Sequence, residues 1–135
     1  MKFKISMLFA FIMCFYINAQ ENVAQVEFET KQIDYGDIEF DSDGKRVFKF
    51  KNVGTAPLIF HRISSSCGCT VPKRPEKPIQ PGESGEIEVE YDTKRVGMFM
   101  KAVSLWTTKA KTPDIILRIK GKVLEEEEEE EEKEK

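Results

Sequence analysis

Apolar and charged side chains alternate along Gly85–Asp92, which reads Gly-Glu-Ile-Glu-Val-Glu-Tyr-Asp. Ile87, Val89 and Tyr91 share one parity, and three glutamates occupy the other. Because successive side chains of a β-strand point to opposite faces, this pattern predicts a strand with one buried face and one charged face.

The same period of two recurs through the chain after Val26, and no stretch has the sustained period of an amphipathic helix. The other predicted strands are Val26–Phe28, Ile33–Phe40, a strand around Phe48 and Phe50, one that opens with Leu58 and Phe60, Met98–Thr107 and Ile115–Val123. About seven strands in roughly 100 residues predict an all-β fold, an immunoglobulin-like antiparallel β-sandwich. A closed β-barrel fits the same spacing.

Turn signals separate these strands. Pro72, Pro75, Pro78 and the Pro81-Gly82 pair are assigned to a connecting segment, because proline cannot sit inside a central strand. The run Asp41–Gly44 has a weak likeness to a calcium loop, but it lacks the twelfth-position glutamate and the flanking helices. We therefore interpret it as a hairpin turn.

The N-terminus has the three parts of a secretory signal peptide. Lys2 and Lys4 precede an apolar run from Ile5 to Ile17, and a short small or polar region follows. The run is shorter than the roughly 20 apolar residues of a transmembrane helix. We expect residues 1–20 to be cleaved, and Cys14 to be lost with them. The mature chain would then be exported, to the periplasm or the extracellular space, with two cysteines in an oxidising compartment.

The net charge of −3 hides three unlike segments. Residues 125–135 carry nine glutamates against two lysines, and they are predicted to be a disordered acidic tail. Its role is either solubilising or the weak binding of Ca²⁺ or a basic protein surface. Residues 21–124, the predicted domain, carry 17 basic and 15 acidic side chains, a balance that does not predict nucleic-acid binding.

Four segments carry a resemblance to a known family. They are Phe48–Phe60, the Ser-Cys-Gly-Cys-Thr signature within Ser65–Thr70, Pro78–Ile87 and Gly97–Lys101. Together they resemble the bacterial DUF1573 family over about Phe28 to Val123. The resemblance implies an exported immunoglobulin-like sandwich, related to the abnormal-spindle, hydin and major-sperm-protein group. Sandwiches of that group serve mainly in protein–protein interaction, so the analogy favours a binding role.

Cys67-Gly68-Cys69 is the only chemically sharp motif in the chain. Cysteines two apart in an extended segment project to the same face, so their sulfurs can meet. Four interpretations remain open: two buried free cysteines, a local disulfide that fixes the loop, a redox-active dithiol, and a pair of thiolates for a soft metal such as Cu(I). Ser66, Gly68 and Thr70 are the supporting loop residues in each of them.

Further ligands for a metal are scarce, since zinc needs four and only His61, Met98 or Met100 could join the cysteines. The parity of His61 places it on a solvated face. Trp106 is open to two interpretations, an exposed aromatic anchor for a partner or a core position.

The sequence predicts no catalytic residues and no cofactor. We expect an exported protein-binding or structural module, with a loop at Cys67 and Cys69 that forms part of the partner surface beside Pro72–Pro81. The alternative is a periplasmic thiol-redox or copper-handling protein that uses the same two cysteines. The partner is expected to be a protein, and no membrane span is expected after the signal is cleaved.

Overall fold

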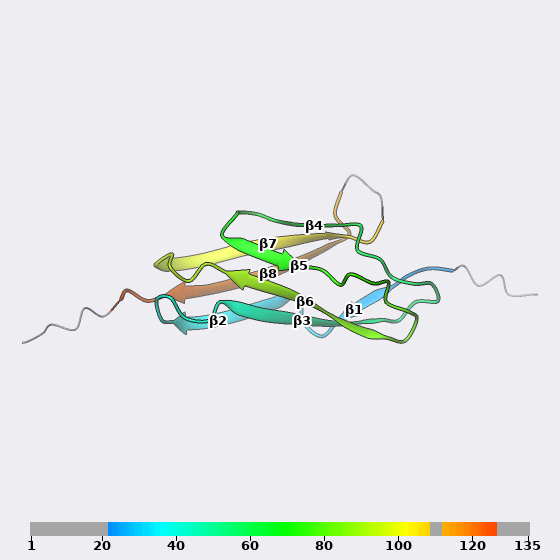
Figure 1. The fold of residues 1–135 in the computed structure, drawn as a ribbon, viewed down its shortest axis with the longest axis horizontal. Helices are drawn as coiled ribbons and strands as arrows, with labels where there is room; N and C mark the ends of the chain where they lie inside the picture. The colour runs from blue at the N-terminus through cyan, green and yellow to red at the C-terminus, as the bar shows by residue number, and fades with distance from the viewer. Residues whose placement is uncertain (1–21, 109–111, 127–135) are drawn as a thin grey trace, which may run out of the picture.

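A computed structural model describes residues 22–108 and 112–126 of the chain. The predicted signal peptide, Cys14 and all but the first two residues of the acidic tail lie outside these residues. Residues 22 and 126 lie at opposite ends of the long axis of the molecule (Figure 1). Within the described ranges, no helix is long and apolar enough to cross a membrane.

Two four-stranded sheets make up the fold (Figure 1). Sheet A has the order β1 (Val26–Phe28), β3 (Lys45–Asn52), β6 (Ser84–Tyr91) and β5 (Thr70–Lys73). Sheet B has the order β2 (Gln32–Ile38), β8 (Ile115–Val123), β7 (Gly97–Trp106) and β4 (Arg62–Ser65). The predicted β-sandwich is confirmed, with eight described strands where about seven were expected.

Alternation along the strands fills the space between the sheets. Ile87, Val89 and Tyr91 are buried, as the pattern of Gly85–Asp92 predicted, and the glutamates between them face solvent. The other fully buried apolar side chains of the core are Phe48, Leu58, Val103, Leu105, Leu117, Ile119 and Val123. Burying each large apolar side chain contributes about 1.5–3 kcal/mol, so this inner layer is the main source of stability.

The predicted positions of two strands were wrong. The strand expected to open with Leu58 begins only at Arg62, and Leu58 instead forms an isolated bridge with Ile79. Pro72 was assigned to a connecting segment but lies inside β5, paired with Val89 of β6. Because β5 is an edge strand, the missing N–H of Pro72 leaves no gap in the ladder.

The Asp41–Gly44 segment is not a hairpin turn, because the strands on either side of it belong to different sheets. It carries the chain from β2 in sheet B to β3 in sheet A. Its backbone is held by Thr93, whose Oγ1 donates to the carbonyl of Ser42 over 2.6 Å. Asp43 accepts a hydrogen bond from the backbone N–H of Lys45, so this carboxylate acts as a turn cap.

Most described strand pairs are antiparallel, but β2 and β8 run parallel. The register shifts between Asp34 and Asp37, where Gly36 adopts a positive φ of 65°. This bulge lets the parallel pair continue to Ile38, beside Val123.

Asn52 is fully buried at the end of β3, and its side chain joins two loops. Its Nδ2 donates to the carbonyls of Ala56 and Ile79 over 2.8 and 2.9 Å, and its Oδ1 accepts the N–H of Gly54. The amide therefore binds backbone groups of both loops, and it shares the carbonyl of Ile79 with the N–H of Leu58.

Three aromatic rings fill one end of the core. Phe99 stacks on Tyr91 with ring centroids 3.8 Å apart, and meets Tyr35 edge-on at 5.3 Å. Gly121 lies against this cluster, and a Cβ added there would come within 2.9 Å of both Tyr35 and Phe99. The absence of a side chain at Gly121 therefore allows the rings to pack between the sheets.

We expect Asn52→Asp to lower the free energy of unfolding by about 3 kcal/mol, because a buried carboxylate cannot donate to the carbonyls of Ala56 and Ile79 and would face them instead. Urea denaturation of the variant and of wild type would measure the loss. Val53→Ala, in the same turn but exposed, is the control and should change stability little. Equal effects of the two substitutions would contradict the role assigned to the amide.

Burial raises the pKa of Tyr35 to about 12, from an ordinary value of 10.0. The folded chain therefore holds this proton more tightly than the unfolded chain, and stability should fall as the pH rises from about 10 to about 12. Tyr35→Phe removes that dependence, but it also removes the hydrogen bond from Oη to the carbonyl of Gly44, 2.8 Å. The variant should be about 1–2 kcal/mol less stable at pH 7. Denaturation at pH 7, 10 and 11 should show that the difference in stability between wild type and the variant becomes smaller as the pH rises. A constant difference would contradict the raised pKa of Tyr35.

Candidate functional site

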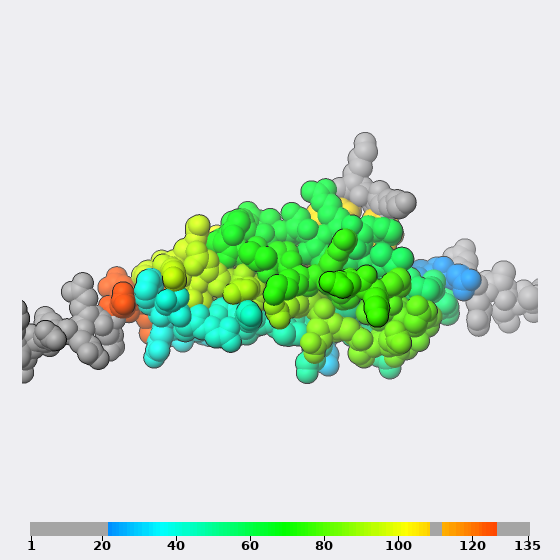
Figure 2. Space-filling model, viewed as in Figure 1, coloured from blue at the N-terminus to red at the C-terminus, as the bar shows by residue number. Residues whose placement is uncertain are grey.

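The chain passes from sheet B to sheet A through four residues, 66–69, which we call the 66–69 corner. β4 ends at Ser65 on the edge of sheet B, and β5 begins at Thr70 on the edge of sheet A. The corner consists of Ser, Cys, Gly and Cys, and such small side chains allow a short connection between two packed sheets. Residues from β5 and the segment that follows it, in green, lie on the face seen in Figure 2.

A disulfide joins Cys67 and Cys69, with their Cα atoms 5.3 Å apart. Cys69 belongs to the hydrophobic core and is only 4% exposed, whereas Cys67 is half-buried and packs against that core. Gly68 is exposed between them. The disulfide therefore joins a residue inside the core, Cys69, to a residue at the boundary of the core, Cys67.

Hydrogen bonds hold both ends of the corner. Ser65 Oγ donates to the carbonyl of Cys67 over 2.7 Å, and the backbone N–H of Asp92 donates to the carbonyl of Cys69 over 2.8 Å. Ser66 exchanges two bonds with Ala102 of β7, its N–H donating over 2.9 Å and its Oγ accepting over 3.1 Å. The corner is thus tied to both sheets.

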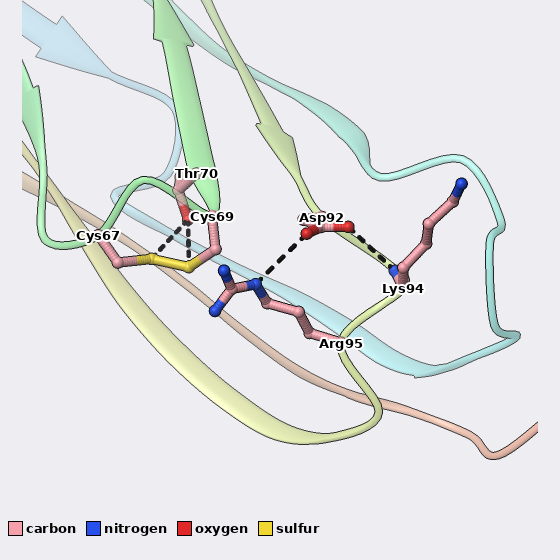
Figure 3. A network of polar contacts seen from close by, with 6 residues as sticks. All are labelled: Cys67, Cys69, Thr70, Asp92, Lys94 and Arg95. Atoms are coloured by element: carbon pink, nitrogen blue, oxygen red, sulfur yellow. Dashed lines mark hydrogen bonds and ion pairs between the residues drawn. A yellow bond between two sulfur atoms is a disulfide. The ribbon is translucent and has the colours of Figure 1, made fainter.

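Thr70 lies beneath the disulfide, with its Oγ1 3.9 Å from each of the two sulfurs (Figure 3). Since bonded sulfurs carry no proton, the hydroxyl is the donor in both contacts. Arg95 Nε pairs with Asp92 Oδ2 at 3.3 Å, and its side chain extends from Asp92 toward the disulfide (Figure 3).

The structure does not bring the other predicted metal ligands to the cysteines. His61 is exposed at the opposite end of β4, where its backbone N–H donates to Trp106. The four residues of β4, a length of about 13 Å, and Ser66 lie between His61 and Cys67. Among the described residues, no three His, Cys, Asp or Glu side chains gather in a group able to hold a metal ion.

Trp106 is 8% exposed, so of the two interpretations the buried position holds and the exposed anchor does not. It lies outside the central cluster of core residues. The guanidinium of Arg62, its cross-strand neighbour on β4, covers the indole ring at 4.6 Å. Because of this cation–π contact, that face of the indole ring is not available to a partner.

The outer face of sheet B carries two methionines that sequence reasoning considered only as metal ligands. Met98 is 88% exposed and Met100 is 69% exposed, side by side on one face of β7. The sequence could have indicated their exposure, because both methionines have the opposite parity to buried Phe99 on this strand. Their cross-strand neighbours on β8 are Lys122 and Lys120. We call this region the methionine face.

The methionine face and the 66–69 corner adjoin. Ala102, which exchanges hydrogen bonds with Ser66, lies two residues after Met100 on the same face of β7. Arg118 of β8 lies opposite Ala102, in one row with the two lysines. Two apolar side chains, a row of cations and the disulfide corner therefore form one continuous surface.

One acidic side chain on this surface has its own partners. Asp34 accepts the N–H of Gly36, which lowers its pKa, and its ion pair with Lys120 at 3.1 Å lowers that pKa further. Arg118 is exposed in the same row. Asp37 of β2 lies in register with Lys122, so the three cations of the row stand beside two carboxylates and leave one excess positive charge next to the methionines.

The outer face of sheet A is different, because lysines of β3 lie opposite glutamates of β6. Lys45 pairs in register with Glu90, and Lys49 with Glu86. Lys73 of β5 binds Glu88 at 2.9 Å, and this contact raises the pKa of the lysine and lowers that of the glutamate. Charges are matched within this sheet, and its exposed valines, Val47 at 38% and Val71 at 54%, are less exposed than the two methionines.

Solved structures with a similar fold come from several organisms. A protein of unknown function from Porphyromonas gingivalis W83 is 18% identical, with a TM-score of 0.64 over 80% of this chain, which spans about half (50%) of that chain. The ASH / PapD-like domain 7 of human CEP192 is 13% identical, with a TM-score of 0.56 over 76% of this chain and 87% of that domain. The VesB protease of Vibrio cholerae is 15% identical, with a TM-score of 0.57 over 84% of this chain and 35% of the protease.

These identities show a shared fold and nothing about activity. No curated protein matches the chain. A family model does match, over residues 26–123, and its description is "Protein of unknown function (DUF1573)". The match covers nearly all of the two sheets, from the first residue of β1 to the last residue of β8. The chain belongs to the DUF1573 family, as the resemblance of its cysteine and glycine motifs predicted.

Proposed function

We propose that this chain is an exported, non-enzymatic module that binds another protein through the methionine face and the adjoining 66–69 corner. The observation that carries the proposal is the exposure of Met98 and Met100 on an otherwise well-packed sandwich. Neighbouring exposed apolar side chains on a folded domain mark an interaction surface. The same surface contains the loop that the sequence analysis assigned to a partner.

Methionine suits this role because its unbranched side chain adapts to an irregular partner surface. Covering one such side chain stabilises a complex by about 1.5–3 kcal/mol, which is a large share of a modest affinity. The outer face of sheet A, with its matched lysines and glutamates, lacks this driving force.

The charge of the methionine face indicates the chemistry of the partner. Arg118, Lys120 and Lys122 form one row beside the methionines. A protein surface with apolar side chains and carboxylates would complement it, and association would weaken at high ionic strength. Binding of Ca²⁺ or a basic surface by the acidic tail stays a prediction, since residues 127–135 lie outside the described chain.

Copper handling by Cys67 and Cys69 receives less support from the geometry. Their sulfurs are bonded to each other, so neither is a thiolate ligand in this state. His61 lies at the far end of β4. The binding role therefore remains the better proposal.

Crosslinking in the exporting cell would test the binding role. We expect a photoreactive amino acid in place of Met98 to capture one protein of defined mass. Adding Met100→Asp should weaken the capture about tenfold, equivalent to ~1.4 kcal/mol, because a carboxylate would meet the carboxylates of the partner. The variant should remain as stable as wild type within about 0.5 kcal/mol, since the side chain is exposed.

The matched control places the photoreactive residue at Val71, which is 54% exposed on sheet A. No defined adduct is expected there. The proposal would be contradicted by equal capture at both positions, by no capture at either, or by a Met98 adduct that Met100→Asp leaves unchanged.

A further inference from the structure

The two sulfurs of the corner differ in their access to solvent. Cys69 is 4% exposed and belongs to the core, whereas Cys67 is half-buried at the boundary of the core. Gly68 is exposed, and apart from its chain neighbours Cys67 and Cys69 no residue comes within 4 Å of the point where its Cβ would stand. The corner is therefore open to solvent at Gly68, and the more exposed of its two cysteines is Cys67.

This asymmetry matters for thiol–disulfide exchange. A thiolate attacks one sulfur of a disulfide, and the other sulfur leaves as a thiolate. Which sulfur is attacked depends on access and on how well the leaving thiolate is stabilised. Access differs between the two cysteines here.

We propose that the Cys67–Cys69 bridge is a directional thiol-exchange site, whose co-substrate is an external thiolate. The incoming sulfur forms a bond with Sγ of Cys67, the bond between Cys67 and Cys69 breaks, and its electron pair remains on Cys69 as a thiolate. No further oxidant or reductant is needed, because one disulfide is exchanged for another. The proposal goes beyond the binding function and does not depend on it.

Thr70 can stabilise the thiolate that leaves. Its buried hydroxyl lies 3.9 Å from both sulfurs, so it can donate to Cys69 once the bond is broken, while the direction of the exchange comes from the greater exposure of Cys67. A hydrogen bond from this hydroxyl stabilises negative charge that develops on Cys69.

The backbone keeps Cys69 in place after the bond breaks. Its carbonyl accepts the N–H of Asp92, and the next residue, Thr70, begins β5 in register with Tyr91. The released thiolate therefore stays close to Cys67 and can attack the mixed disulfide, which expels the incoming thiol and restores the bridge. The corner would capture a thiol reversibly.

The first test uses the full oxidised chain and glutathione as the thiol. After a short reaction, mild acid stops the exchange, denaturant exposes the freed thiol to N-ethylmaleimide, and peptide mapping locates both modifications separately from Cys14. We expect glutathione on Cys67 and the maleimide on Cys69, at least tenfold more often than the reverse. Glutathione on Cys69, an even division, or a bridge that never reacts would overturn the proposal.

Single-cysteine chains give a second measurement that does not require a trapped intermediate. The thiol of Cys67 in Cys69→Ser should react with an aromatic disulfide reagent at least tenfold faster than the thiol of Cys69 in Cys67→Ser. Cys14→Ser in both chains removes the background reaction. Equal rates in two folded variants would contradict the difference in access, and if a variant fails to fold, the wild-type mapping decides.

Thr70→Val tests the leaving group, since it removes the hydroxyl with little change in shape. In the reduced chain, we expect alkylation of Cys69 to be about three- to tenfold slower at pH 7 and unchanged at pH 10, because the pKa of the thiol rises. A merely structural role would slow the reaction equally at both pH values. An unchanged pH profile would contradict the stabilisation of Cys69 by Thr70.

The source of the thiol is distinguished by replacing glutathione with a single-cysteine peptide that carries flanking leucine and glutamate residues. Faster reaction of the peptide, lost in Met98→Ser/Met100→Ser, would identify a protein thiol that docks on the methionine face. Equal rates would identify small thiols as sufficient co-substrates. Both outcomes support exchange at Cys67, and the second would separate the exchange site from the proposed binding surface.

Discussion

The burial of two inner sheet faces against each other is the constraint on which the rest of this structure depends. Phe48 and Ile87 from sheet A meet a layer from sheet B in which Val103 and Leu117 are also fully buried. Because side chains alternate along a strand, filling this layer places every second residue of each strand in solvent. The chemistry available to the molecule is therefore confined to its outer faces and to the connections between the sheets.

Each connection must satisfy backbone groups that the sheets no longer pair. Thr93 does so for the segment from β2 to β3, and the amide of Asn52 does so for two loops beside the end of β3. The 66–69 corner uses a disulfide together with hydrogen bonds to both sheets. A connection held so firmly keeps its sulfurs in fixed and unequal positions, which makes directional exchange at Cys67 a chemical possibility.

The two outer faces carry different surfaces although their strands follow the same pattern. On sheet A, lysines of β3 lie opposite glutamates of β6, so most of these charges already have an opposite charge beside them. On sheet B, Met98 and Met100 lie beside a row of cations and adjoin the corner. Binding and thiol exchange would thus occupy neighbouring parts of one surface, and each could exist without the other.

The sequence alone determined the fold class, the buried face of most strands and the family. These depend on local features: the alternation at Ile87, Val89 and Tyr91, and the Ser-Cys-Gly-Cys-Thr motif. The alternation of apolar and polar residues along one strand does not show which other strand it pairs with. It follows from the packing of the whole chain, which decided that β2 runs parallel to β8 and that Pro72 lies in an edge strand.

The tertiary structure also decided the environment of single side chains. Arg62 covers Trp106 from the neighbouring strand, and the Asn52 amide binds loops that are distant from each other in the sequence. The same is true of the two cysteines, which are equivalent in the sequence. They differ in exposure only because the corner joins two sheets, with Cys69 turned into the core and Cys67 left at its boundary.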